Sequence, residues 1–388
     1  MLTHSTYETD NRVRRYAETL VKRGDHVDVI ALSSGDARPG LTEINGVTVH
    51  RIQHRERNER TKWTYAGRLL RFLLGSSILI TRLHRKCRYD LIHVHNMPDF
   101  LVFAAWYPKL SGAKLILDIH DLVPELFVSK FSTAEESSYV RFLKTLERRS
   151  AAFVDHVIVS NDLWYETLTS RSVPRGKCSV FINHVDPDIF YRRARTREDG
   201  KFIVIFPGSF QWHQGLDIAI KAFARIKDAV PNAEFHLYGV AGGGNLQAEL
   251  ADLASQMGID SRVKFHTSLP IEQVASVIAN ADLGVVPKRA DSFGNEAYST
   301  KIMEFMSQGI PVVVSKTKID SFYFDDSVVR FFTSGDDQAM ADAMLEVITN
   351  RAVRERMIAK GYEYVAKNSW EAKKQEYLHL VDTLSSHE

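Results

Sequence analysis

Two glutamates with a lysine between them are the residues whose spacing most clearly suggests chemistry. Residues 293–315 read FGNEAYSTKIMEFMSQGIPVVVS, in which Glu296 precedes Glu304 by eight positions. The glycine stop that follows predicts a helix over 300–308. Lys301 then lies in the first turn, where free backbone N–H groups and the helix dipole favour an anion. The stretch predicts a diphosphate site flanked by carboxylates that accept hydrogen bonds from sugar hydroxyls. The alternative is an ordinary Lys–Glu pair on a solvated helix face.

The loop after a predicted strand at 201–209 is a second candidate for phosphate binding. It reads PGSFQWHQGLDIAI, and Gly208 and Gly215 bracket a tight turn that leads to a helix N-terminus. The alternative is a plain connection between a strand and a helix. His120, which ends a predicted strand in LDIHD, is a candidate for the reacting centre, and its alternative is a hydrogen-bonded histidine at a strand end.

Apolar strand patterns alternate with helical patterns along the whole chain and must position these residues. The expected strands are 26–32, 91–95, 114–120, 156–160, 201–209, 233–239, 263–268, 281–287 and 310–315. Nearly continuous Val, Ile and Leu runs between helices indicate parallel sheets covered on both faces. We therefore predict an α/β fold with two Rossmann-like, doubly wound domains that face each other across a cleft, with ligands at the carboxyl ends of the strands.

The domain boundaries follow from composition. We predict an N-terminal domain over 1–185, a polar, charge-rich linker over 186–200 and a C-terminal domain over 201–368. A length of 388 residues, with 44% hydrophobic and 25% charged residues, suits two globular domains. The Asp-Pro-Asp triplet at 186–188 is interpreted as a turn rather than a metal site.

Other features exclude several classes of protein. No run of 18 apolar residues is present, the N-terminus lacks a signal-peptide core, and Cys87 and Cys178 have neither metal-ligand nor disulfide spacing. A cytoplasmic protein without a bound metal or cofactor is the simplest expectation.

Positive charge is concentrated in the first half of the chain. Residues 1–200 carry a net charge of +7 and residues 201–388 a net charge of −5, and 51–88 hold 11 basic against two acidic residues. The stretch 65–86 combines an apolar face with arginines, which is typical of a helix on an anionic membrane surface. The alternative is a helix packed on the sheet with a basic solvated side. We expect no nucleic-acid partner, because no binding motif is present.

The ordered set of motifs resembles retaining glycosyltransferases of family 4, the group 1 transferases with the GT-B fold. The set consists of RYAETLVKRGDHVDVIAL, DLIHVHN, LDIHDLVPELF, FINHVDPDIF, FPGSFQWHQGLDIAI and the Glu-x7-Glu stretch running into GIPVV. It covers almost the whole chain. The resemblance also implies that a final helix over 369–388 crosses back to the N-terminal domain.

The resemblance implies specific roles for the residues of the signature. Glu304 would bind the nucleotide ribose, Glu296 the donor hexose, and the backbone near Ser299 and Thr300 the diphosphate, with Lys301 nearby. His120 would face the donor sugar, and Asp121 is predicted to orient its ring.

Two departures from the family pattern concern the phosphates. Ser209 and Gln214 occupy positions where the family usually has Arg and Lys, and YETDNRV replaces a Gly-Gly loop after the first strand. His213, Lys301 or Arg12 would have to supply the missing positive charge.

The resemblance implies transfer of a hexosyl group from a nucleotide diphosphate sugar to an acceptor hydroxyl, with retention of configuration and without a metal. The acceptor would be a sugar or a lipid-linked sugar, in cell-surface polysaccharide or glycolipid synthesis, on the inner face of the membrane. The alternatives are a non-catalytic nucleotide-sugar-binding protein and a nucleotide-sugar epimerase of the same fold.

Overall fold

The computed structural model describes residues 1–33, 39–55, 62–131, 134, 136–240 and 245–386. The chain divides into two compact units, and each is described by itself. The first unit comprises Met1–Asn183 together with the residues from Lys374 onward, and the second comprises His184–Lys373. Between Val180 and Phe202 the chain forms no helix or strand, and the predicted linker 186–200 belongs to the second unit.

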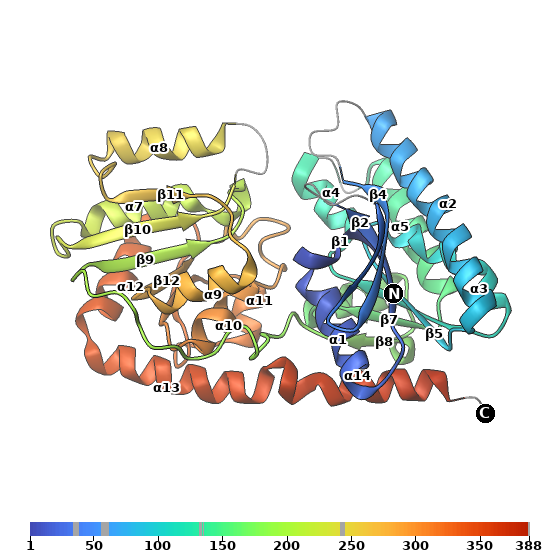
Figure 1. Cartoon of the computed structure of the whole chain (residues 1–388). Coiled ribbons are helices and arrows are strands. Elements are labelled where there is room, and N and C mark those ends of the chain that lie inside the picture. The colour runs from blue at the N-terminus through green and yellow to red at the C-terminus, as the bar shows by residue number, and fades with distance from the viewer. Residues whose placement is uncertain (34–38, 56–61, 132–133, 135, 241–244, 387–388) are drawn as a thin grey trace. The chain divides into compact units, whose positions relative to one another are not determined.

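The first unit is built on an eight-stranded sheet in the order β3-β4-β2-β1-β5-β6-β7-β8 (Figure 1). Its strands are β1 (Leu2–Thr6), β2 (Asp28–Ser33), β3 (Gly40–Ile44), β4 (Val47–His54), β5 (Leu91–His95), β6 (Lys114–Ile119), β7 (His156–Val159) and β8 (Cys178–Val180). All neighbouring strands are parallel except β3 and β4. Its helices are α1 (Asn11–Arg23), α2 (Lys62–Cys87), α3 (Trp106–Leu110), α4 (Val123–Phe131), α5 (Ser138–Phe153) and α6 (Asp162–Arg171), with 3-10 turns η1 (Tyr7–Thr9), η2 (Asp99–Ala105) and η3 (Arg175–Lys177).

The last helix, α14 (Trp370–Ser385), has most of its length in the first unit. Tyr377 of this helix is fully buried, and its ring lies 4.3 Å from that of Tyr16 on α1. The helix therefore contributes to the core of a unit whose other residues come from the start of the chain.

The second unit has a six-stranded, wholly parallel sheet in the order β11-β10-β9-β12-β13-β14. Its strands are β9 (Phe202–Pro207), β10 (Ala233–Tyr238), β11 (Val263–His266), β12 (Leu283–Val286), β13 (Val312–Ser315) and β14 (Arg330–Phe332). Its helices are α7 (Leu216–Ile226), α8 (Leu246–Gln256), α9 (Ile271–Ala279), α10 (Thr300–Ser307), α11 (Lys318–Tyr323), α12 (Asp337–Thr349) and α13 (Arg351–Asn368), with the 3-10 turn η4 (Trp212–Gln214). The mostly parallel sheet of the first unit and the wholly parallel sheet of the second confirm the predicted α/β class.

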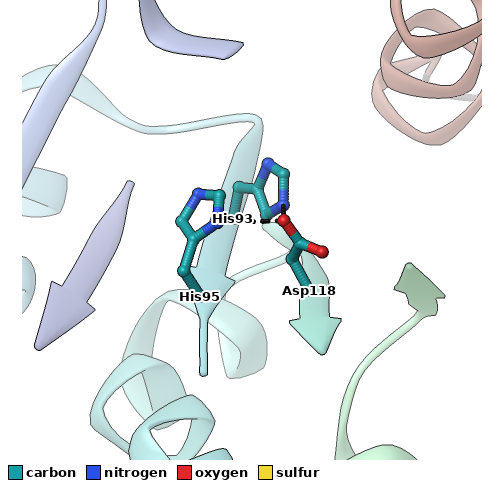
Figure 2. A group of neighbouring side chains, drawn as sticks. All are labelled: His93, His95 and Asp118. Carbon is teal, nitrogen blue, oxygen red and sulfur yellow. Dashed lines mark hydrogen bonds and ion pairs between the residues drawn. The ribbon is translucent and has the colours of Figure 1, made fainter. Parts of the chain in front are cut away.

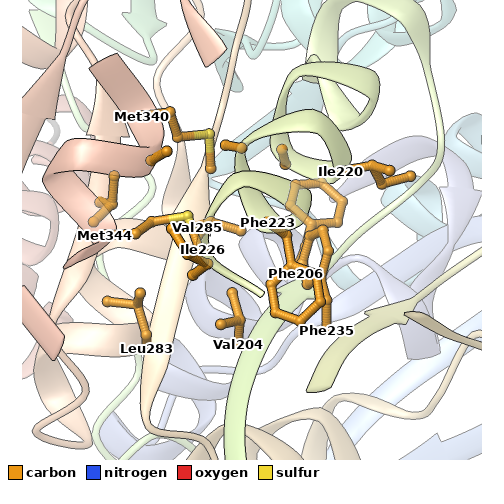
Figure 3. Close-up of a cluster of buried hydrophobic side chains, with 14 of the residues drawn as sticks. Val204, Phe206, Ile220, Phe223, Ile226, Phe235, Leu283, Val285, Met340 and Met344 are labelled. Carbon is orange, nitrogen blue, oxygen red and sulfur yellow. The ribbon is translucent and has the colours of Figure 1, made fainter. Parts of the chain in front are cut away.

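The core of the second unit lies between its sheet and helices α7 and α12. Figure 3 shows Val204 and Phe206 of β9, Phe223 of α7 and Met340 and Met344 of α12 gathered there, all buried. Alternate residues of β9 thus point into this core, as the two-residue period of a strand requires.

Helix α10, which carries most of the predicted signature, packs very close to β12. A Cβ on Gly284 would stand 2.6 Å from the ring of Phe305, so only glycine leaves room for that ring. Gly309, at φ 73°, follows the helix and ends it as predicted. Gly284 and Gly309 therefore set the position of α10 against β12, and with it the position of the first turn of α10.

Candidate functional site

The first turn of α10 presents a cation and unpaired polar groups. Among the residues that the structure describes, the Lys301 ammonium has no carboxylate within ion-pair distance, and the buried Ser299 hydroxyl has no hydrogen-bond partner. Burial lowers the pKa of Lys301, an effect that Glu304 opposes and Lys288 reinforces. Such an arrangement favours an incoming anion, which would stabilise the charged form of the lysine.

Glu304 lies one turn further along the same helix. Burial raises the pKa of its carboxyl group, whereas Lys301 and a hydrogen bond from Thr300 lower it. A half-buried carboxylate with few protein partners can accept hydrogen bonds from a diol.

The loop between β9 and α7 meets this turn directly. A Cβ on Gly208 would stand 2.6 Å from Lys301 Cε and 3.2 Å from Lys301 Nζ, and the ammonium lies 5.1 Å from the ring centroid of Phe206. Gly208 and Lys301, 93 positions apart in the chain, are therefore brought together within one unit.

The other predicted residues of this loop show no positive charge near neutral pH. Ser209 is exposed, and its hydroxyl accepts a hydrogen bond from Gln211. Burial lowers the pKa of His213, and its Nε2 lies 3.0 Å from Gln214 Nε2. Of the residues of this unit that were predicted to replace the family Arg and Lys, Lys301 is thus the one that can supply positive charge.

The loop before α10 carries Glu296 and is held by a buried lysine that the sequence reading missed. Lys288 forms an ion pair of 2.9 Å with Asp320 and donates a hydrogen bond of 2.7 Å to the carbonyl of Ala297. Glu296 Oε1 lies 3.7 Å from Lys318 Nζ. The signal that could have identified Lys288 is a lysine directly after a buried strand, because a buried ammonium needs partners.

In the first unit, His120 follows β6 and belongs to a buried polar network. Figure 2 shows Asp118 of β6 beside His93 and His95 of β5. Asp118 Oδ2 lies 3.2 Å from His120 Nε2 and 3.1 Å from His95 Nδ1. The His120 ring is therefore joined to a carboxylate with no exposed surface.

The backbone of His120 is fixed from two neighbouring segments. Its N–H donates to Asn96 Oδ1 at 2.8 Å, and its carbonyl accepts from Ser160 Oγ at 2.8 Å. Asn96 Nδ2 in turn donates to Asp99 Oδ1 and to the carbonyl of Asp121. These contacts hold the end of β6 in one conformation.

The His120 ring is hydrogen-bonded to Asp118, and not to Asp121, for which the orienting role was predicted. Among the described residues, the hydrogen bonds of the His120 ring go to Asp118 and His95. Side chains two apart along an extended segment point to the same face, whereas the next residue points to the other. Asp118 can therefore reach the ring, and Asp121 shows no hydrogen bond to it.

Arg12 is also engaged within the first unit. Its Nε and NH2 bind the two oxygens of Asp118 at 2.8 and 2.7 Å, and its NH1 donates to the Phe181 carbonyl and to Asn183 Oδ1. Burial opposes its charge, but Asp118 raises its pKa above the usual value. A phosphate contact by Arg12 stays a prediction, and these contacts count against it.

Two family models match the chain and together span most of it. The model described as "Glycosyl transferase 4-like domain" matches residues 9–184, and "Glycosyl transferases group 1" matches residues 188–364. The chain belongs to the group 1 glycosyltransferases. The family that the motifs resemble is thus confirmed.

Relatives and solved structures agree with this assignment. An uncharacterized glycosyltransferase of Methanocaldococcus jannaschii is 24% identical, with 91% of this chain and 90% of the relative covered. D-inositol 3-phosphate glycosyltransferase of Thermobifida fusca is 25% identical over 92% of this chain and 84% of its own length. Sucrose-phosphate synthase of Thermosynechococcus elongatus has a TM-score of 0.79 at 20% identity, covering 99% of this chain and 98% of its own. Anabaena HepE in complex with UDP-glucose has a TM-score of 0.73 at 15% identity, with 98% of each chain covered.

The glycosyltransferase therefore has the GT-B fold predicted from the motifs, and its general activity is transfer of a sugar. Within the part of the chain that the structure describes, no helix is both long and apolar enough to cross a bilayer.

Proposed function

We propose that this glycosyltransferase moves a hexosyl group from a nucleotide diphosphate sugar to the hydroxyl of a sugar or lipid-linked acceptor. The observation that supports it most is the unpaired Lys301 ammonium beside Gly208, at the first turn of α10 with the unpartnered Ser299 hydroxyl. A UDP-glucose complex exists for a neighbour of the same fold, which makes a nucleotide sugar a reasonable donor class.

In the proposed complex the diphosphate binds Lys301 and the N–H groups of Ser299 and Thr300, with Gly208, Ser209, His213 and Gln214 lining the loop beside it. Glu304 accepts hydrogen bonds from the ribose, and Glu296 contacts the hexose. Hydrogen bonds to a charged group each contribute about 1.5–3 kcal/mol. Glu304 should therefore contribute measurably to donor affinity.

In the proposed reaction the bond from the anomeric carbon to the diphosphate oxygen breaks and a bond to the acceptor oxygen forms with retention of configuration. The acceptor proton passes to the leaving diphosphate. Lys301 and the α10 N-terminus stabilise the negative charge that develops there, a role that elsewhere falls to a metal ion. His120 contacts the transferred sugar.

Release of nucleoside diphosphate in the presence of acceptor tests this proposal. A thermal-shift screen against nucleotide sugars first identifies the donor, because a ligand that binds the native state raises its melting temperature. Glu304→Gln should weaken donor binding roughly 10- to 100-fold, since 1.4 kcal/mol corresponds to a factor of ten. Glu249→Gln, an exposed change on α8, is the matched control.

Each outcome of these measurements has a definite reading. Unchanged donor affinity in Glu304→Gln would refute the proposed site. Donor binding without nucleotide release would indicate a binding protein, and conversion of the donor sugar without acceptor would indicate an epimerase. NMR of the product anomer tests retention, and activity in the presence of a chelator tests independence from metal.

The exposed face of α2 supports a second part of the proposal, peripheral contact with an anionic membrane surface through residues 65–86. Leu70, Leu74 and Ile78 lie one turn apart on this helix and are each 55% exposed. Arg71 and Arg82 are exposed on the same helix and, among the described residues, have no carboxylate partner. Apolar side chains in a row can insert among lipid chains, and the unpaired cations beside them are attracted to anionic headgroups. Such contact would bring the enzyme to a lipid-linked acceptor on the cytoplasmic face, in polysaccharide or glycolipid synthesis.

A further inference from the structure

The carboxylate of Asp118 is hydrogen-bonded by three side chains of the first unit, one arginine and two histidines. Both its oxygens are bound by Arg12, and its Oδ2 also lies within hydrogen-bond distance of His95 Nδ1 and His120 Nε2. Burial opposes ionisation of Asp118, but Arg12, followed by His120 and His95, holds its pKa well below the usual range. A carboxylate without a proton can only accept hydrogen bonds, so both ring nitrogens that bind it must carry hydrogen.

This requirement determines which nitrogen of each ring is protonated. His95 Nδ1 and His120 Nε2 are 3.3 Å apart and both face Asp118 Oδ2, so neither can serve as the acceptor for the other while both donate to the carboxylate. Among the described residues, all hydrogen bonds of the His120 ring go through Nε2. Its Nδ1 is left as the nitrogen that a ligand can meet, on a side chain that is 21% exposed.

We propose that Asp118 is a positioning residue that holds His120 as the Nε2–H tautomer and thereby presents the lone pair of Nδ1 to the substrate. Arg12 keeps Asp118 ionised, and His95 fixes the shared oxygen from the other side. The inference rests on the proposed function only in taking His120 as a residue at the reacting centre.

The same residues could instead be a metal site, since ligand atoms of His93, His95 and Asp118 all lie within 4.8 Å of one another (Figure 2). One fact favours the hydrogen-bonded arrangement. The Arg12 guanidinium already neutralises the carboxylate that a cation would need, and it would repel that cation at short range.

The protonation of His120 can be observed directly. With histidine labelled at the ring nitrogens, two-bond nitrogen–proton correlation spectra of the full chain at alkaline pH distinguish the two tautomers, and the spectrum of His120→Gln assigns the signal. We expect the wild-type signal to be that of the Nε2–H form. A wild-type signal of the Nδ1–H form would overturn the proposal without need of any variant.

Variants then test whether Asp118 is the cause. Asp118→Asn should bring in the Nδ1–H form, because an amide can accept or donate, whereas Ser160→Ala, which loosens only the backbone of His120, should not. An unchanged tautomer in folded Asp118→Asn would count against the proposal. Stoichiometric Zn²⁺ that displaces the ring signals of His93, His95 and His120 together would overturn it in favour of a metal site.

Kinetics separate this inference from the proposed function. If the chain transfers hexose, Asp118→Asn should lower kcat roughly 100-fold with little change in the KM for the donor, because only the orientation and protonation of a group at the reacting centre change. A rise in KM at unchanged kcat would contradict the positioning role. If wild-type protein shows no transfer, the proposed function fails while the tautomer measurement still decides the inference.

Discussion

Lys301 packs against a position in the β9–α7 loop where there is no side chain, with its Cε 2.6 Å from where a Cβ on Gly208 would stand. Gly208→Ala should therefore push the lysine tip aside, and the ring of Phe206, 3.3 Å from the added Cβ, would have to shift as well. We expect the donor affinity of the folded variant to fall about tenfold or more, as for loss of one charged hydrogen bond.

Titration calorimetry with the nucleotide sugar found in the thermal screen would measure this effect. Gly176→Ala is the control, since a Cβ there meets nothing within 4 Å. Equal affinities of the two variants would show that Lys301 does not contact the donor.

The buried ion pair of Arg12 and Asp118 should be essential for stability. Arg12→Met leaves an uncompensated carboxylate in the core, and loss of one partner of a buried pair costs about 3–5 kcal/mol. Urea unfolding followed by circular dichroism measures the difference. Arg175→Met, which breaks an exposed pair with Glu166, should change the free energy of unfolding little. If the two variants were equally stable, the network around Asp118 would not be as the structure shows it.

Arg12→Lys tests the phosphate role that the sequence suggested for this residue. Because four of the five N–H groups of the guanidinium already donate to protein acceptors, we expect donor affinity to survive the change provided that the protein folds. A tenfold loss of affinity in folded protein would restore Arg12 as a phosphate contact.

Asp99 should make stability depend on pH. Burial raises its pKa from 3.8 to about 7, with Glu147 adding to the rise and Asn96 opposing it. The folded state then holds a proton that the unfolded state releases above about pH 4, so this contribution is full below pH 4 and is lost as pH rises through 7.

Asp99→Asn removes this dependence. The free energy of unfolding of the variant relative to wild type should increase by a few kcal/mol between pH 4 and pH 8. Urea unfolding at both pH values measures it. A difference that stays constant with pH would mean that Asp99 ionises normally in the folded protein.

Membrane contact through α2 predicts binding to anionic vesicles. Replacing Leu70, Leu74 and Ile78 by serine should reduce co-sedimentation with phosphatidylglycerol vesicles at least tenfold, because each apolar side chain contributes about 1.5–3 kcal/mol when fully buried. Leu41→Ser, an exposed change on β3, is the control. Wild-type protein that fails to pellet with anionic vesicles would remove this part of the proposal.

Most strands were predictable because buried parallel strands are continuous apolar runs, as at β5 and β13. The β3–β4 hairpin was missed because β3 is largely exposed and lacks such a run. Its signal was Asn45-Gly46, both at positive φ, which is typical of a two-residue hairpin turn.

The helix predicted over 300–308 agrees with α10 to within one residue, because a glycine stop and a buried strand mark its C-terminal end. The network around Asp118 was not predicted. An aspartate in the middle of the apolar run LILDI was its signal, since a charge in a buried strand must have a partner. The identity of that partner, Arg12, could not be predicted because the two residues are 106 positions apart and only tertiary packing joins them.

Tyr377 donates or accepts a hydrogen bond with His93 Nδ1 at 3.1 Å and fills the core of the first unit from the far end of the chain. During synthesis, residues 1–183 leave the ribosome long before this tyrosine exists. The first unit therefore lacks the Tyr377 side chain beside Tyr16 and His93 until the second unit has been translated. This differs from the general rule that domains fold in order of synthesis. Completion of the core of the first unit is thus tied to synthesis of the second.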